Sequence, residues 1–493
     1  MAKDNVIELK NVAFSYSGSK STLSDIDLSI RSGEFVLLCG KSGCGKTTLI
    51  RLMNGLIPHY YSGQSSGKIE IMNRDIRDYE LYELAPIAST VFQNPKSQFF
   101  NLNTSSEVLF GLENINSSKE FMDSRLKEIK KLFKIDHLLD RNIFNLSGGE
   151  KQIIAIAAAY AMDTAIILMD EPTSNLDLAS INEIEDMLLK LKSMGKTIII
   201  SEHRINFLKN LIDRAILLND GRIIREFSRD EFNSLNDDDL KELGLRSLSS
   251  PKAPIANESK KTSEYRIKSL SFKYKNSREN IFDIENLSLP TNSIIGLVGN
   301  NGVGKSSFAH TLIGIAKANK DKILRHEKII NYKDRLKLSY LVLQDVSYQL
   351  FTESVRDELS LGSYKGFKSI DCDAILSSLN LKELENSHPL GLSGGQKQRV
   401  SIAAGIASGS EIMIFDEPTS GMDRYHMEQT AELINSLKSE NRLIIIITHD
   451  LELLSLVGEK ILMMENGNLN FLEPGEDSWN DLINKLSKKS SNS

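Results

Sequence analysis

Short runs of apolar residues recur along the chain, and many of them end at a glycine-rich or charged segment. The runs at residues 35–39 and 294–298 each precede a glycine-rich turn, and residues 48–53 then follow with helical spacing. Other runs, at residues 165–169 and 412–415, end in paired carboxylates. Apolar runs of this length, bounded by turn residues, predict buried strands that present polar groups at their ends.

The chain is a repeat. The pattern G-x-x-x-x-G-K-[ST] occurs at residues 40–47 and again at 299–306. Leu-Ser-Gly-Gly, Asp-Glu-Pro-Thr-Ser and a strand-end histidine also occur twice, and each of these three pairs is separated by 246 residues. Between the glycine-rich turn and Leu-Ser-Gly-Gly the second copy is 13 residues shorter. A constant offset through several motifs indicates duplication.

The glycine-rich turn between a strand and a helix predicts a phosphate-binding loop. Glycines such as Gly43 and Gly45 let backbone N–H groups converge on an anion, and the helix N-terminus adds positive potential. Lys46 would reach the β- and γ-phosphates, and the Thr47 hydroxyl would face Mg²⁺. Lys305 and Ser306 occupy the same places in the second copy.

Two further pairs precede or follow this loop at matched spacing. Tyr16 and Tyr274 lie about 30 residues before the loop lysines, where an aromatic ring can stack on adenine. Packing within a strand is the alternative for each tyrosine, and the matched spacing favours stacking. Gln93 and Gln344 follow apolar runs, where a glutamine can contact Mg²⁺ and the attacking water; a polar strand end is the alternative.

The second half of each copy supplies acidic and basic groups. Of the two carboxylates at residues 170–171, one can hold Mg²⁺ through water and the other can orient a nucleophilic water. His203, at the end of another strand, can bind the γ-phosphate. The Leu-Ser-Gly-Gly segments open helices and are either second anion sites or ordinary helix N-caps.

Composition limits the classes of function. The chain has 493 residues, 40% of them hydrophobic, which is enough for large cores. Its net charge of −6 argues weakly against nucleic acid as a partner. The three cysteines have no metal-ligand spacing and are typical of a reducing compartment. We find neither a signal peptide nor an apolar run long enough to span a membrane, so any membrane role is expected to depend on a partner.

This ordered set of motifs resembles the ATP-binding-cassette (ABC) ATPases, twice over. The resemblance implies an α/β fold with two tandem P-loop NTPase domains. Each would have a mainly parallel-sheet core, a helical subdomain and an antiparallel β subdomain. We expect the first domain at residues 1–246 and the second at 263–486. A flexible, polar linker with two prolines would cover 247–262, and a disordered tail 487–493.

The resemblance also assigns roles and implies ATP and Mg²⁺ as cofactors. The catalytic positions are Glu171, His203, Glu417 and His449. The metal positions are Thr47, Gln93, Asp170, Ser306, Gln344 and Asp416. The nucleotide positions are Tyr16, Gly40, Ser42, Gly43, Gly45, Lys46, Thr47, Thr48, Gln93, Ser147, Gly148, Gly149, Tyr274, Gly299, Asn301, Gly302, Gly304, Lys305, Ser306, Ser307, Gln344, Ser393, Gly394, Gly395 and Gln396.

In this family two cassettes close head to tail, which would explain the surplus of anion sites. Ser393, Gly395 and Gln396 would complete the Lys46 site, and Ser147 and Gly149 the Lys305 site. Residues 174–177 and 420–423 resemble the segments called D-loops.

Segments 55–61, 93–100 and 201–204 are similar to those of energy-coupling-factor importers of vitamins or transition-metal ions. That similarity implies a membrane coupling protein and a substrate-binding membrane subunit as partners, at the cytoplasmic face of the membrane, and no nucleic acid. Residues 99–100 and 350–351 would line the docking groove.

Two alternatives stay open. A sugar-importer ATPase with tandem cassettes typically has one degenerate copy, whereas both copies here are complete. A soluble ABC protein that acts on the ribosome carries a long charged arm between its cassettes, and here the linker is short.

Two departures from the family pattern give hypotheses. Glu150 stands where the second copy has Gln396, and an extra carboxylate near a phosphate site would make the two sites hydrolyse ATP at unequal rates. Cys44 lies at a helix N-terminus, so we expect a lowered thiol pKa and high reactivity.

Overall fold

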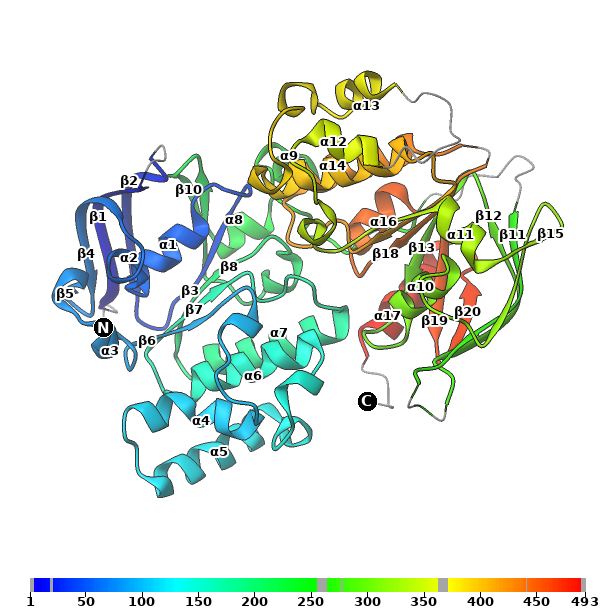
Figure 1. Cartoon of the computed structure of the whole chain (residues 1–493). Coiled ribbons are helices and arrows are strands. Elements are labelled where there is room, and N and C mark those ends of the chain that lie inside the picture. Colours follow the sequence, from blue (N-terminus) through cyan, green and yellow to red (C-terminus); the bar gives the residue numbers. More distant parts are fainter. Residues whose placement is uncertain are drawn as a thin grey trace. The chain divides into compact units, whose positions relative to one another are not determined.

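The computed structural model describes residues 4–17, 21–254, 264–275, 277, 279–361, 371–439 and 441–488. The chain divides into two compact units (Figure 1). The first comprises residues 1–250 with 421–425, and the second comprises residues 251–420 with 426–493. Each unit contains one four-stranded and one six-stranded sheet.

The six-stranded sheet of the first unit is parallel except at one edge. Its strands, in spatial order, are β10 (Arg222–Ser228), β9 (Arg214–Asn219), β3 (Phe35–Gly40), β8 (Thr197–Ser201), β7 (Ile166–Asp170) and β6 (Ala88–Val91). β10 pairs antiparallel with β9, and the other pairings are parallel. The antiparallel sheet has the order β2 (Leu23–Arg31), β1 (Asn5–Tyr16), β4 (Gly63–Ile71) and β5 (Arg74–Asp75).

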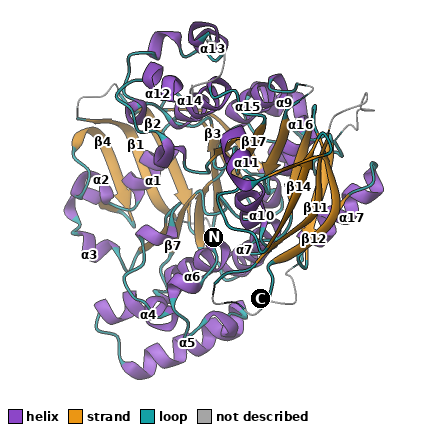
Figure 2. Cartoon of the chain, turned by 45° about the vertical axis from the view of Figure 1, so that its right-hand side comes forward, coloured by secondary structure: helices purple, strands orange, loops and turns teal. Residues whose placement is uncertain are grey.

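Helices surround these sheets. They are α1 (Lys46–Met53), α2 (Leu56–His59), α3 (Leu81–Leu84), α4 (Thr104–Asn114), α5 (Lys119–Phe133), α6 (Gly148–Ala161), α7 (Leu178–Ser193), α8 (Arg229–Asn233) and α9 (Asp237–Glu242). In Figures 1 and 2, α4 and α5 lie at the opposite end of this unit from β1, β2 and β4. They form the helical subdomain that the family resemblance implied.

β3 shows how the sequence builds two cores on one strand. Side chains alternate between the faces of a strand. Phe35, Leu37 and Cys39 therefore enter the core with α6 and α7, whereas Val36 and Leu38 enter the core with α1 and the antiparallel sheet. All five are fully buried. This is why the strand appears as an unbroken apolar run before the glycine-rich turn.

The second unit repeats this plan. Its six-stranded sheet has the order β16 (Ser339–Val342), β17 (Ile412–Asp416), β18 (Leu443–Ile447), β13 (Ser293–Val298), β19 (Lys460–Glu465) and β20 (Asn468–Phe471). Its antiparallel sheet has the order β12 (Phe282–Pro290), β11 (Glu264–Phe272), β14 (Lys320–Arg325) and β15 (Lys328–Ile330). Its helices are α10 (Lys305–Leu312), α11 (Tyr332–Leu338), α12 (Val355–Leu361), α13 (Cys372–Ser378), α14 (Gly394–Ala407), α15 (Arg424–Ser436), α16 (Leu451–Val457) and α17 (Glu476–Leu486). The α/β prediction of two tandem cassettes is confirmed.

The segment between the units differs from the expected free tether where the structure describes it. Leu248 is buried in the core of the first unit. In the second unit, Trp479 Nε1 donates to the Pro251 carbonyl at 2.8 Å, and Ser455 Oγ donates to the Lys252 carbonyl at 2.6 Å. Residues 255–263 of the predicted linker and 489–493 of the predicted tail lie outside the described residues.

Candidate functional site

The phosphate loop of the first unit is a backbone cradle at the carboxyl end of β3. Gly43 has φ +79°, a left-handed conformation that favours glycine. α1 begins after Gly45, and no side chain caps its N-terminus. Free N–H groups at a helix N-terminus attract anions. The equivalent residues, Gly302 at φ +78° and Gly304 before α10, repeat this geometry in the second unit.

Lys46 is a buried ammonium at the centre of this cradle, 4% exposed. Its Nζ donates to the carbonyls of Gly40 at 3.0 Å and Lys41 at 3.1 Å, and lies 3.4 Å from His203 Nε2. Among the described residues it forms no ion pair with a carboxylate. Burying a charge without a counter-charge is unfavourable, so this arrangement fits an anionic ligand.

The next pair of groups fits a divalent cation. Thr47 Oγ1 donates to Asp170 Oδ1 at 3.1 Å, where α1 starts and β7 ends. Two neighbouring ligands of an octahedral Mg²⁺ lie about 2.9 Å apart. Burial raises the pKa of Asp170, and the same cause raises that of Asp416 in the second unit. Ser306 Oγ donates to Asp416 Oδ2 there at 3.3 Å. The hydroxyl–carboxylate pair is thus present twice.

Glu171 and Glu417 stand at the turn that leaves this strand end. Their φ angles are +46° and +48°, uncommon for residues other than glycine, and such outliers concentrate at functional sites. In the first unit Gln93 Nε2 donates to Glu171 Oε2 at 2.8 Å, and His203 Nε2 lies 3.3 Å from Glu171 Oε1. The structure therefore brings the predicted glutamine, glutamate and histidine together.

The second unit assembles the same groups with different contacts. Lys305 Nζ donates to the Gly299 carbonyl at 2.7 Å and lies 3.2 Å from His449 Nε2. His449 Nε2 lies 2.9 Å from Asn301 Oδ1 and 3.6 Å from Glu417 Oε1. Gln344 follows β16 by two residues, as Gln93 follows β6.

Carboxylates next to the strand-end histidines bind the Asp-Glu-Pro-Thr-Ser segments, and the sequence reasoning missed these contacts. In the first unit Glu202 Oε1 accepts hydrogen bonds from Thr173 N at 2.8 Å and Oγ1 at 2.6 Å. In the second unit the acceptor for Thr419 Oγ1 is Asp450, on the other side of the histidine, at 2.7 Å. A threonine within Asp-Glu-Pro-Thr-Ser and a carboxylate next to the strand-end histidine were the available signals.

The tyrosines before the loops contact the loop helices. Tyr16 OH lies 3.4 Å from Thr48 Oγ1 and accepts a hydrogen bond from Arg51 at 3.0 Å. The Arg51 guanidinium lies 4.2 Å from the centre of the Tyr61 ring. In the second unit Tyr274 OH lies 3.0 Å from Ser307 Oγ, and this tyrosine is 56% exposed. Both rings lie next to the hydroxyl that follows the predicted metal position.

The Leu-Ser-Gly-Gly segments form capping boxes within their own units. Ser147 Oγ accepts from Glu150 N at 3.2 Å, while Glu150 Oε2 accepts from Ser147 N at 2.8 Å. Gln396 accepts from Ser393 N at 2.9 Å in the same way. Each serine therefore caps its helix, α6 or α14. The Glu150 carboxylate contacts both this cap and Arg141, which lies 3.4 Å away.

The expectation for Cys44 was wrong. The thiol is 4% exposed, and burial raises its pKa, although Lys46 acts in the opposite direction. Desolvation of the thiolate therefore outweighs the helix N-terminus and the neighbouring ammonium.

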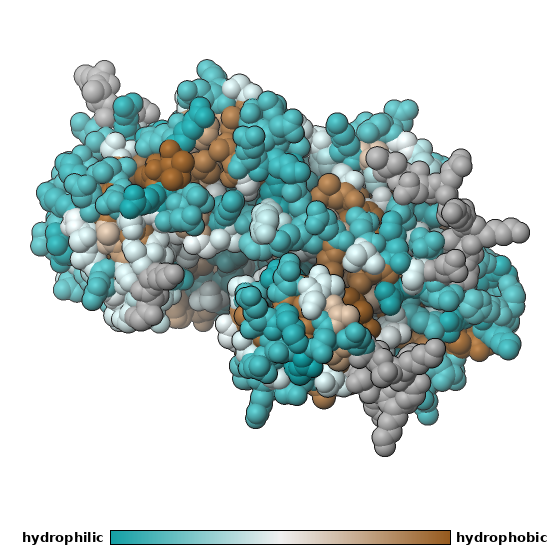
Figure 3. All heavy atoms as spheres, turned by 90° about the horizontal axis from the view of Figure 1, so that it is seen from above, coloured by the Kyte–Doolittle hydropathy of each residue, from teal (hydrophilic) through white to brown (hydrophobic). Residues whose placement is uncertain are grey.

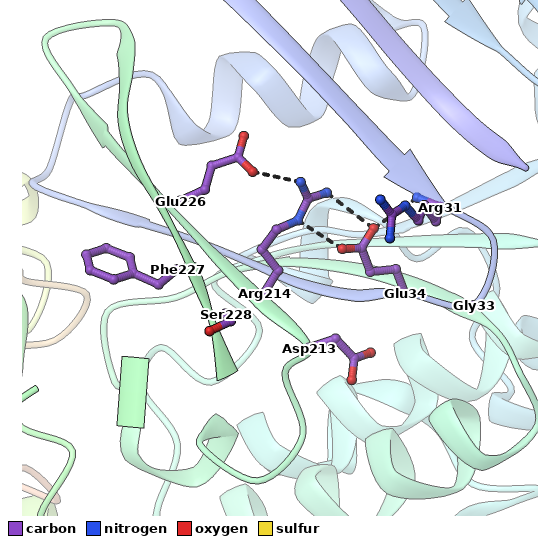
Figure 4. Close-up of a pocket in the computed structure, with 8 residues that line it drawn as sticks. All are labelled: Arg31, Gly33, Glu34, Asp213, Arg214, Glu226, Phe227 and Ser228. Atoms are coloured by element: carbon purple, nitrogen blue, oxygen red, sulfur yellow. Dashed lines mark hydrogen bonds and ion pairs between the residues drawn. The ribbon is translucent and has the colours of Figure 1, made fainter. Parts of the chain in front are cut away.

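A separate pocket of about 470 Å³ lies at the amino ends of β3 and β9 (Figure 4). The phosphate loop lies at the opposite, carboxyl end of β3. Arg214 crosses it and contacts Glu226 at 2.8 Å and Glu34 at 2.9 Å. Because Arg214 already forms ion pairs with both glutamates, we do not assign a ligand to this pocket.

The surface shows apolar patches among hydrophilic residues (Figure 3). Phe100 and Phe351 are 76% and 77% exposed, whereas Phe99 packs against a core and Leu350 is buried. Thus one member of each predicted docking pair is available to a partner. Within the described part of the chain, no helix has the length and apolar character needed to cross a bilayer.

Comparison with known proteins supports the family. The family model of the ABC transporter matches residues 23–174 and 282–420. A putative ABC transporter ATP-binding protein of Treponema denticola is 40% identical over 473 residues, covering 94% of this chain and 96% of the relative. A putative HMP/thiamine import ATP-binding protein of Bacillus subtilis is 32% identical over 504 residues, covering 95% and 92%.

Among solved structures, archaeal ABCE1 in a ribosome-bound model has a TM-score of 0.66 at 20% identity, covering 96% of this chain and 80% of that one, which shows the fold alone. Taken with the duplicated phosphate loops, these matches show that the chain belongs to the ABC transporter family and is an ATPase with two tandem ATP-binding cassettes.

Proposed function

We propose that this chain is the ATP-hydrolysing motor of a membrane importer of the energy-coupling-factor type, for a vitamin or a transition-metal ion. The observation that carries the proposal is that both units hold a complete set of groups. Each unit has a buried lysine in a backbone cradle, a hydroxyl–carboxylate pair, and a glutamate beside a histidine. An importer driven by ATP at two sites requires that both sets be present.

In this proposal ATP and Mg²⁺ bind at each loop. Lys46 and the N-terminus of α1 would hold the phosphates, and Thr47 with Asp170 would bind the cation. Mg²⁺ would neutralise charge on the β- and γ-phosphates. Glu171 would accept a proton from the attacking water, and His203 would bind the γ-phosphate. No covalent intermediate is needed, because positioning and charge stabilisation supply the catalysis.

We also propose that the two units close head to tail around ATP. Ser393, Gly395 and Gln396 would then complete the Lys46 site, and Ser147 and Gly149 the Lys305 site. A serine hydroxyl that accepts a bond from its own helix still has a proton to donate to a phosphate oxygen. Cycles of closure and reopening would pass force to membrane partners at the cytoplasmic face.

The importer type rests on two supports. The Bacillus subtilis relative carries the description of a putative HMP/thiamine import protein and matches nearly the whole chain. Residues 55–61, 93–100 and 201–204 resemble segments of energy-coupling-factor importers.

The exposed aromatic residues after Gln93 and Gln344 are the proposed contacts with a membrane coupling protein. Phe100 N donates to Glu107 at 3.1 Å, and Phe351 N donates to Glu358 at 3.0 Å. Both carboxylates are buried, in α4 and α12. In both units the backbone of the aromatic residue is therefore held by a buried carboxylate, seven residues after Gln93 or Gln344.

Affinity purification from detergent-solubilised membranes tests the proposal. The tagged chain should retain integral-membrane proteins, and Phe100→Ser with Phe351→Ser should lose them while keeping basal ATPase activity. Ile224→Ser is the matched control, since Ile224 is also exposed (57%) but lies in β10, at the opposite edge of the six-stranded sheet from β6, the strand that leads to Gln93. Uptake of vitamins and metal ions by the purified complex in vesicles would then identify the cargo. Sedimentation with ribosomes and not with membranes would overturn the proposal.

A further inference from the structure

Ser201, the last residue of β8, connects the two carboxylate residues of the first site. Its hydroxyl donates to Asp170 Oδ1 at 2.6 Å, and Glu171 N donates to the same hydroxyl at 3.2 Å. The side chain is fully buried. A backbone N–H can only donate, so Ser201 Oγ is the acceptor toward Glu171 and its single proton is directed to Asp170. The orientation of this hydroxyl is therefore fixed by two neighbours.

The second unit has no hydroxyl at this place. Asp170 pairs with Ser201 in the sheet, and Asp416 pairs with Ile447 at the same register position. The backbone contact is retained, because Glu417 N donates to the Ile447 carbonyl at 2.8 Å, as Glu171 N does to the Ser201 carbonyl at 3.0 Å. The two sites thus share their backbone but differ in a side chain that contacts the predicted metal ligand.

We propose that Ser201 is a positioning residue that holds the Asp170 carboxylate for the divalent cation, and that the first site therefore binds the metal–nucleotide complex more tightly than it would with isoleucine. This inference rests on the proposed role of Thr47 and Asp170 in binding Mg²⁺. A Thr47 hydroxyl that turns its oxygen to the cation no longer needs to donate to Asp170. The Ser201 bond would then remain to orient the carboxylate, and hydrogen bonds to ligating carboxylates raise metal affinity.

The test measures metal binding directly, with Mn²⁺ as the probe. Lys305→Ala restricts nucleotide binding to the first site, and the parent carrying it is compared with its Ser201→Ala and Ser201→Thr derivatives. Electron paramagnetic resonance gives the Mn²⁺ dissociation constant in the presence of a non-hydrolysable ATP analogue. Loss of one charge-assisted hydrogen bond predicts about tenfold weaker Mn²⁺ binding for Ser201→Ala. Ser201→Thr, which keeps the hydroxyl, should stay within about twofold of the parent.

Reciprocal variants at the second site provide an independent test if an alanine variant folds poorly. With Lys46→Ala as the parent, nucleotide binds at the second site. There, Ile447→Ser should tighten Mn²⁺ binding, and Ser201→Ala should change nothing. Equal Mn²⁺ affinity in the Ser201→Ala variant and its parent would overturn the inference. An equal loss of analogue binding in EDTA would also overturn it, because a positioning role requires the loss to depend on metal. If the Lys305→Ala parent binds neither analogue nor metal, the proposed nucleotide site is itself wrong.

Discussion

The buried carboxyl of Glu202 gives a prediction whose size follows from the structure. Glu202 is 3% exposed and accepts two hydrogen bonds from Thr173 and one from His203 N at 3.1 Å. Burial raises the pKa of Glu202 to about 7 from 4.5, the ordinary value of a glutamate side chain, although the Thr173 hydrogen bonds act in the opposite direction. The folded protein therefore holds a proton here at pH values where the unfolded chain has released it.

The sign of the pH effect follows from this difference. Between pH 4.5 and pH 7 the folded state binds more protons at this position than the unfolded state, so the free energy of unfolding falls as pH rises. With these two pKa values the loss between pH 5 and pH 8 is about 2.5 kcal/mol. Glu202→Gln cannot titrate and should lack this contribution. The variant should therefore gain stability relative to wild type as pH rises, by about 2.5 kcal/mol over that interval.

Urea unfolding followed by circular dichroism at pH 5, 6, 7 and 8 measures this difference. The readout is the change in the variant-minus-wild-type difference with pH, since its absolute value also contains the lost hydrogen bond to His203 N. The exposed Glu113, replaced by glutamine, is the matched control for the removal of one carboxylate. Trp479, the single tryptophan, lies in α17 and reports on the second unit by its fluorescence. Parallel pH curves for wild type and Glu202→Gln would refute the reasoning.

Three further predictions concern the two sites. Glu171→Gln and Glu417→Gln should each lower kcat by at least about tenfold, as expected for a general base, but to unequal residual values. The reason is that Gln93 contacts Glu171, whereas Thr448 Oγ1 contacts Glu417 at 3.0 Å. Equal residual activities of the two variants in steady-state ATPase assays would contradict this. Tyr16→Ala should raise KM for ATP about tenfold through lost stacking, and Tyr16→Phe should raise it much less. Equal KM values for the two variants would argue against stacking. Cys44 should react with maleimide more slowly than the more exposed Cys372, because burial raises its pKa. Mass spectrometry of the labelled peptides checks the order, and faster labelling of Cys44 would contradict the burial argument.

Much of the core could be predicted because its signals are local. β3, β7 and β8 are apolar runs that end at a glycine or a polar residue, and apolar runs recur at the matching places in the second unit. The short helices α8 and α9 were missed, although each begins with a capping box, Ser228 with Glu231 and Asn236 with Asp239. A capping pattern identifies where a helix starts. It does not show that Phe232 and Leu240 will reach the core of the first unit.

In the candidate site, too, some residues could be predicted from the sequence and others could not. Lysines, strand-end carboxylates and histidines were predictable, because each follows a turn or strand whose end position is fixed. The partners of Thr173 and Thr419 were not. Which carboxylate reaches each threonine, Glu202 before the histidine or Asp450 after it, depends on how the chain leaves the strand. Ser201 did leave a signal, since it is a polar residue at the end of an isoleucine run where the second copy has Ile447.

A shift of one position along the strand explains how two sites with the same motifs can differ. Asp170 pairs with Ser201, so a hydroxyl at this register position meets the predicted metal ligand. The hydroxyl of Thr448 lies one residue further along, just beyond the end of β18, and it contacts Glu417 instead. In the first unit the Ser201 hydroxyl therefore contacts the predicted metal ligand, and in the second unit the Thr448 hydroxyl contacts the proposed base. Because the difference lies beside the motifs, exchange of residues 201–202 with 447–448 should transfer it between the units without touching any predicted nucleotide ligand.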